Sequence, residues 1–139
     1  MPISHRTYHK LRLVIATASG TLTDEDVFGY QRNVWSDPEI AGYNELVDMD
    51  DVGHIALPSP DRVRDLANLS ATMDQRPGSS KMAVIAAENL AFGLGQMYAA
   101  RRDMNPQSTK QVEVFRKRLK ALEWLGVTEA ELEAESVEG

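Results

Sequence analysis

The chain has 139 residues, of which 42% are hydrophobic and 26% are charged, proportions typical of one globular domain and not of a disordered or fibrous protein. It contains no cysteine, which excludes disulfide bonds, thiolate nucleophiles and the common zinc and iron–sulfur sites. The net charge of −6 is concentrated in residues 127–139, which hold five glutamates and no basic residue, so we expect a nearly neutral single domain over residues 1–126 and an acidic C-terminal tail.

The distribution of charged and apolar residues also limits the partners. A protein that binds duplex nucleic acid normally presents a basic face, whereas the one basic cluster here, residues 116–120, alternates with leucine as on a solvated helix. No apolar run is long enough to cross a bilayer, and the amino terminus lacks the apolar segment of a secretion signal. We therefore expect a soluble cytoplasmic domain that binds no nucleic acid and does not insert into membranes.

The first half of the chain predicts strands that flank a helix. Residues 11–18 (LRLVIATA) are rich in branched side chains and predict a strand, and residues 3–9 predict a weaker antiparallel edge strand before it. A helix is expected over residues 24–36, because Thr23 can cap it and acidic residues fill its first turn. A short strand at residues 44–49 follows, and we expect its continuation to be irregular up to Pro58.

The second half predicts two further strands, each followed by a helix. Ser59-Pro60-Asp61 has the residue types of a helix start and predicts a helix to about residue 74. The apolar run at residues 82–87 is typical of a central strand covered on both faces. A helix over residues 89–103 capped by Asn89, a strand at residues 111–115 and a helix over residues 116–125 complete the pattern. The expected core positions of these three helices are Val63, Leu66, Ala67, Ser70 and Met73, then Leu90, Leu94, Met97 and Tyr98, then Leu119, Leu122 and Leu125.

A stripe of small residues runs along the helix at 89–103. Ala91, Gly95 and Ala99 are spaced four apart, and a glycine within a helix costs about 1 kcal/mol relative to alanine. We interpret the stripe as a site of close packing, either against the sheet of the same domain or against a second subunit. If the stripe packs against a second subunit, the protein is a homodimer, and this alternative stays open.

Strands and helices therefore alternate along the chain with short connections. That order predicts an α/β fold, with a four- to five-stranded mixed sheet, about four helices and right-handed crossovers between parallel strands. Helices would cover one or both faces of the sheet.

Several phrases of the sequence resemble the SpoIIAA-like proteins, relatives of the STAS domains of anti-sigma-factor antagonists. The phrases are Gly20-Thr21-Leu22-Thr23-Asp24, Ser36-Asp37-Pro38, Leu46-Val47-Asp48, Ala91-Phe92-Gly93-Leu94, Val112-Glu113-Val114-Phe115 and Ala121-Leu122-Glu123-Trp124-Leu125. The resemblance implies a mixed sheet with helices mainly on one side, and a role in binding a protein or a small ligand. It also implies a phosphorylatable serine near the second helix, but acidic residues occupy the corresponding loop, and Ser59 is sufficiently explained as a helix cap.

The acidic stretch at residues 48–54 is the one candidate for catalysis. Asp50, Asp51 and His54 carry metal-ligating groups within five residues, although a solvated acidic turn is the favoured interpretation. Asp48-Met49-Asp50 is similar to the acidic motif of aspartyl phosphatases and of receiver domains, but the lysine and the later acidic residues that those proteins need are missing. We predict no catalytic residue, metal or cofactor.

Three functional hypotheses remain open. The first is a non-enzymatic binding or regulatory module whose partner or ligand face carries Asp50, Asp51, His54, Ser59 and Asn89. The second is a carrier of a small apolar ligand or lipid in a cleft between the sheet and the helix at residues 89–103. The third is a metal-dependent hydrolase that uses residues 48–54. A cavity with apolar walls would favour the carrier, and convergent carboxylates would favour the hydrolase.

Overall fold

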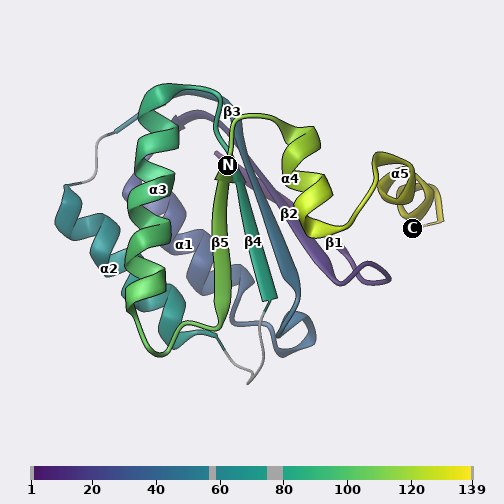
Figure 1. Ribbon diagram of the computed structural model, residues 1–139, viewed down its shortest axis with the longest axis horizontal. Helices are drawn as coiled ribbons and strands as arrows, with labels where there is room; N and C mark the ends of the chain where they lie inside the picture. Colours follow the sequence, from purple (N-terminus) through teal and green to yellow (C-terminus); the bar gives the residue numbers. More distant parts are fainter. Residues whose placement is uncertain (1, 57–58, 75–79, 139) are drawn as a thin grey trace.

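The computed structural model describes residues 2–56, 59–74 and 80–138, and a five-stranded sheet runs through its centre (Figure 1). The strands lie in chain order, β1 (Ile3–Tyr8), β2 (Leu13–Leu22), β3 (Asn44–Ile55), β4 (Ser80–Ile85) and β5 (Lys110–Phe115). β1 pairs antiparallel with β2, and every other neighbouring pair is parallel. The predicted α/β class, the mixed sheet and the antiparallel edge strand are thus confirmed.

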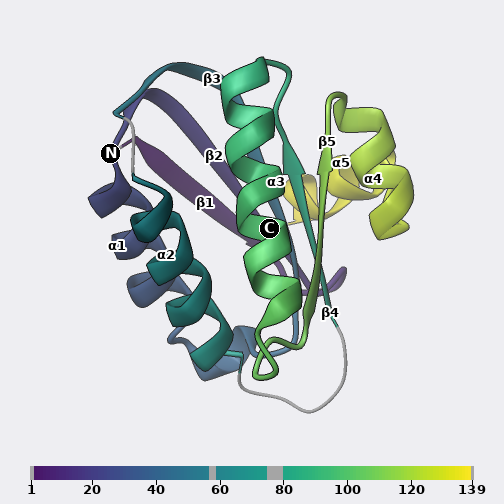
Figure 2. The ribbon, with the colours of Figure 1, turned by 60° about the vertical axis from the view of Figure 1, so that its left-hand side comes forward.

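The helices form two layers, one on each face of the sheet (Figure 2). α1 (Asp24–Val34), α2 (Pro60–Thr72) and α3 (Asn89–Met104) cover one face, while α4 (Arg118–Leu125) and α5 (Glu129–Glu138) cover the other. From β2 to β5 each strand is added beside the previous one, always in the same direction across the sheet. Right-handed crossovers in one direction place their helices on one face, so α1, α2 and α3 lie together. A short 3₁₀ helix, Pro38–Ile40, precedes β3.

The central strands bury side chains on both faces, as the apolar run of β4 predicted. In β4, Ala83 and Ile85 belong to the cluster beneath α4 and α5, whereas Met82 and Val84 belong to the cluster beneath α2 and α3. The same alternation places Leu46 of β3 on the α4 face. The side toward α1–α3 is the one that holds the candidate site.

Side-chain caps start the first two helices as the sequence predicted. Thr23 Oγ1 accepts from the Asp26 amide and the Asp26 carboxylate accepts from the Thr23 amide, which is a complete capping box. Ser59 Oγ accepts from the Arg62 amide at 3.2 Å, with Pro60 in the first turn. These caps satisfy amide groups that have no partner within the helix.

Residues 50–55 form a strand, so the prediction of an irregular stretch was wrong for them, while its end at Pro58 lies outside the described residues. β3 continues to Ile55 because β2 also runs further than predicted and supplies it with a partner, so that Asp51 pairs with Ser19 and His54 with Thr21. Two register shifts interrupt this part of the ladder, and Gly20, with φ of +67°, allows the irregular backbone. The Ser19-Gly20 pair therefore lies within a strand and not in a turn.

The small stripe of α3 packs against the domain's own sheet. A Cβ atom built on Gly95 would lie 3.2 Å from both Cγ atoms of Val114 in β5 and 3.7 Å from Val84 in β4, and Ala91 is buried. Gly95 thus packs closely against the sheet, while Ala99 at the end of the stripe is half-buried. Leu90 and Met97 turn outward, so their predicted core role was wrong. The packing needs no second subunit, and the homodimer stays a prediction without support from this stripe.

Two further expectations at helix ends are corrected. Asn89 does not cap α3, because Glu88 holds the N-cap position and no side chain caps the helix. Leu119, expected in the core, is 65% exposed, since α4 begins at Arg118 and directs Ala121, Leu122 and Leu125 inward instead.

The acidic C-terminal segment forms a helix that contacts the domain. Thr128 and Glu131 make reciprocal capping interactions at the start of this helix, and Arg118 forms an ion pair with Glu129 at 2.9 Å. Leu132 is 5% exposed and joins the core cluster on the α4 face. Among the described helices, none has the length and the apolar character required to cross a membrane.

Candidate functional site

The residues that the sequence predicted to form one partner or ligand face do not lie together in the structure. Asp50, Asp51 and His54 are exposed on the last half of β3, and Ser59 serves as the cap of α2. Asp50 approaches the start of α3, where Asn89 lies. Its Oδ1 accepts from the amide of Ala87, two residues before Asn89, at 3.2 Å. Within residues 2–56, 59–74 and 80–138, no three His, Asp or Glu side chains are grouped as metal ligands would be. The hydrolase hypothesis gains no support.

A cavity lies instead between the sheet and the helices α1, α2 and α3. Its volume is about 140 Å³, close to the roughly 150 Å³ of an engineered apolar cavity that stays dry and binds benzene or xenon. The residues that line it come from the first four strands and the first three helices, and the apolar ones are Ile3, Ala16, Ala18, Leu22, Val27, Val47, Met49, Ile55, Ala56, Val63, Leu66, Met82, Val84, Ala91, Leu94 and Gly95.

Small side chains leave this space between the layers. Ala16 and Ala18 of β2 line the cavity where larger strand residues would fill it, and Ala91 does the same on α3. As a result Val47, although it lies on the central strand under the helices, is only partly buried. A folded protein normally fills such a space, because packed interiors contain few voids larger than a water molecule.

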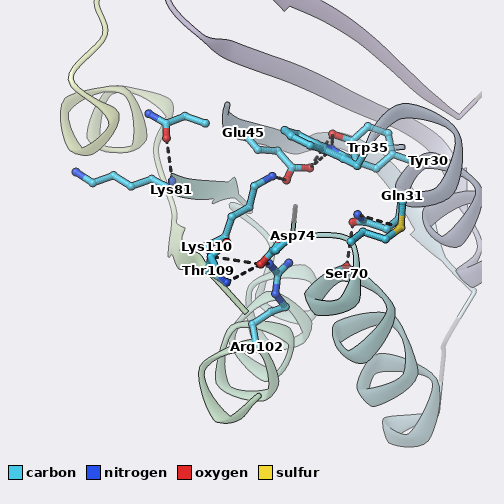
Figure 3. A network of polar contacts seen from close by, with 12 residues as sticks. Tyr30, Gln31, Trp35, Glu45, Ser70, Asp74, Lys81, Arg102, Thr109 and Lys110 are labelled. Carbon is cyan, nitrogen blue, oxygen red and sulfur yellow. Dashed lines mark hydrogen bonds and ion pairs between the residues drawn. The ribbon is translucent and has the colours of Figure 1, made fainter. Parts of the chain in front are cut away.

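Tyr30 and Glu45 form a polar end of the cavity wall. Both belong to a network of polar contacts around a buried ion pair (Figure 3). The carboxylate of Glu45, 2% exposed, accepts from Tyr30 Oη at 2.7 Å and Trp35 Nε1 at 3.1 Å with one oxygen, and from Lys110 Nζ at 2.9 Å with the other. Lys110 reaches it from β5, and its ammonium lies 3.1 Å from the centre of the Trp35 ring. The strong hydrogen bonds and the cation–π contact offset the cost of burying both charges.

A second ion pair lies next to the first. Arg102 of α3 donates to Asp74 Oδ2 at 2.7 Å, to Tyr98 Oη at 2.7 Å and to Ser108 Oγ at 2.8 Å. Asp74 also accepts from the Thr109 amide at 2.7 Å, which connects the end of α2 to the start of β5. The two pairs together hold two cations and two anions, so the polar region carries no net charge.

Burial changes the proton affinities of three groups in this region. Desolvation, followed by the charge of Glu45, raises the pKa of Tyr30 well above its usual value. Desolvation also raises the pKa of Tyr98, against the opposing effect of Arg102, and lowers the pKa of Lys110, against the attraction of Glu45. Neither phenol is suited to lose its proton near neutral pH, so the region resembles a structural network more than an acid–base centre.

Gln31 of α1 also lines the cavity, and it pairs with Ser70 of α2. Gln31, 8% exposed, accepts from Ser70 Oγ with Oε1 at 2.9 Å. Its amide nitrogen Nε2 donates to the sulfur of Met73 at 3.8 Å. Figure 3 shows Gln31 directed from α1 toward Ser70 of α2.

The sequence analysis missed this network, although one signal was present. Glu45 stands in phase with Val47 and Met49 along β3, so period-two alternation places its carboxylate on the buried face. A buried glutamate needs a cationic partner, but Lys110 lies 65 residues further along the chain and cannot be paired with it from spacing.

No family model matches this chain, and no curated protein matches it. Among solved structures, the chain is similar to an uncharacterized protein of the DUF3478 family with a SpoIIAA-like fold from Shewanella loihica PV-4. The two share 19% sequence identity with a TM-score of 0.49, over 81% of this chain and 83% of that one.

Proposed function

We propose that this protein is a non-enzymatic binding module that takes a small, largely apolar ligand into the cavity between its sheet and helices α1–α3. The single observation that supports the proposal is the cavity itself, with its apolar walls and one polar end. Small-molecule sites commonly combine such walls with a few placed polar groups that orient the ligand. The proposal combines the first two hypotheses drawn from the sequence and leaves the hydrolase aside.

The partly covered apolar side chains supply the driving force. Val27, Val47, Leu66 and Leu94 all line the cavity and all remain partly accessible. A ligand that covers them removes apolar surface from water, which is worth about 25 cal/mol per Å² before the cost of association. A ligand of six to ten heavy atoms would then bind with a dissociation constant on the order of 0.1–1 mM.

Titration with toluene, followed by the methyl resonances of the protein, tests this function. We expect saturable shifts at Val47, Leu66 and Leu94, while Leu122 of α4, which packs against the other face of the sheet, does not shift. Val47→Phe fills the cavity from β3 and should weaken binding by about tenfold or more, since the ligand and the ring compete for one space.

Val52→Phe is the matched control. Val52 lies on the same strand and is half-buried, but it does not line the cavity. Its affinity for toluene should stay within about twofold of the original. Equal weakening by both substitutions, or shifts that never saturate, would contradict a ligand site in this cavity.

A further inference from the structure

Gln31 stands out among the polar side chains that line the cavity in the described part of the chain. Those side chains are Thr23, Asp24, Tyr30, Gln31, Glu45 and Tyr98. The carboxylate of Asp24 accepts from Arg62 at 2.7 Å, Tyr30 donates to Glu45, and Tyr98 accepts from Arg102. Thr23 Oγ1 accepts from the Asp26 amide at 3.2 Å, so each of the five other side chains has a partner of its own.

The Gln31 amide has donor capacity left over. It carries two N–H bonds, yet the partner of Nε2 is a thioether sulfur 3.8 Å away, which is a weak acceptor. The amide is held in place by Ser70, which is fully buried, so Nε2 cannot easily turn to bulk water. A buried donor without a good acceptor destabilises the folded protein, and an acceptor on the ligand would recover part of this cost.

The charges around the polar end restrict the ligand further. Lys110 is already paired with Glu45 at 2.9 Å, and Arg102 with Asp74 at 2.7 Å. A carboxylate brought into the cavity would be an additional buried anion without a free cation, beside two anions already present. Burying an unpaired charge is far more costly than burying a neutral carbonyl.

We infer that the cavity selects neutral ligands with one hydrogen-bond acceptor oxygen, such as a ketone, ester or amide on an apolar body, and that Gln31 Nε2 donates to this oxygen. The inference rests on the proposed function, because it assigns the chemical class of ligand that the same cavity takes. Gln31 is then a specificity-determining residue, while the apolar walls provide most of the affinity.

Three small aromatic compounds of similar shape separate the parts of this inference. Acetophenone carries a carbonyl oxygen, α-methylstyrene replaces that oxygen with a methylene group, and benzoate carries a negative charge. In the unchanged protein, acetophenone should shift the side-chain amide protons of Gln31 on binding, and α-methylstyrene should leave them in place. Benzoate should bind at least about tenfold more weakly than acetophenone, because its charge has no partner.

Gln31→Met tests the hydrogen bond directly. The substitution should reduce the preference for acetophenone over α-methylstyrene by about fivefold to tenfold, the value of one net hydrogen bond. Gln111→Met, an exposed glutamine on β5, should leave the ratio unchanged. The ratio of the two affinities is measured on one protein, so a general loss of stability in the variant does not change it. The shift of the Gln31 amide protons is measured in the unchanged protein and needs no variant.

The outcomes distinguish this inference from the proposed function. If neither neutral compound binds saturably, the proposed function fails. If α-methylstyrene binds in the cavity but the Gln31 amide protons do not respond to acetophenone and the ratio is unchanged in Gln31→Met, the function stands and the role of Gln31 falls. Tight binding of benzoate would overturn the selection for neutral ligands.

Discussion

Replacement of Lys110 by methionine should destabilise the protein more than any single change on its surface. The Lys110 and Glu45 side chains are 7% and 2% exposed and lie 2.9 Å apart, so the change leaves a buried carboxylate without its countercharge. Breaking a buried pair in this way costs about 3–5 kcal/mol, a large part of the 5–15 kcal/mol by which a typical domain is stable. The contact of Lys110 with the Trp35 ring is lost as well.

Urea unfolding followed by tryptophan fluorescence measures this loss, because Trp35 lies beside the pair. Lys120→Met provides the control, since Lys120 and Glu123 form an exposed pair at 3.6 Å, and such pairs contribute less than about 1 kcal/mol. Adding Glu45→Gln to Lys110→Met removes the orphaned charge while keeping an acceptor for Tyr30 and Trp35. The double variant should recover at least about 2 kcal/mol.

Two results would refute this reasoning. The first is a loss in Lys110→Met no larger than that in Lys120→Met. The second is a further loss, in place of a recovery, when Glu45→Gln is added. Either would mean that the pair is hydrated in solution and that the polar end of the cavity is not a low-dielectric site.

Three other predictions concern packing and pH. Gly95→Val should cost about 1–3 kcal/mol, because even a Cβ atom added at this position would lie only 3.2 Å from Val114. An unchanged melting temperature would show that α3 packs differently. Leu132→Ala should cost about 2–3 kcal/mol because this residue is 5% exposed; a thermal melt unaffected by the change would show that the acidic helix does not dock. The raised pKa of Tyr30 means that its contribution to stability is present below the usual phenol pKa of about 10 and is lost as pH rises through the folded value. Tyr30→Phe should therefore lose less stability between neutral pH and pH 11 in urea titrations than the unchanged protein, with the titration of Lys110 common to both, and equal losses would contradict the shift.

The sequence predicted the fold well because its signals are local. The branched run of β2 and the apolar run of β4 indicate strands by composition alone, and Thr23 and Ser59 mark helix starts through contacts within one turn. The error at residues 50–55 arose because the partner of that stretch is the end of β2, about 30 residues earlier, and strand pairing cannot be read from one segment.

The candidate site was only partly predictable for the same reason. A cleft between the sheet and α3 was among the hypotheses, and the stripe at Ala91 and Gly95 did indicate close packing. The network of Glu45, Lys110 and Arg102, however, depends on side chains from separate elements that only the tertiary fold brings together. The exposed acidic residues attracted attention because they are adjacent in sequence, yet the structure leaves them on the surface.

A crystal grown without added ligand and pressurised with xenon gives the most direct test of the central claim, because xenon occupies apolar cavities without needing a hydrogen bond. We expect a xenon site bounded by Val47, Leu66 and Leu94, between the sheet and α1–α3. In a crystal of Val47→Phe, the same site should be empty. If xenon is absent from this space in the unchanged protein, and no bound molecule occupies it, the cavity is closed in the folded protein and the proposed binding function is wrong.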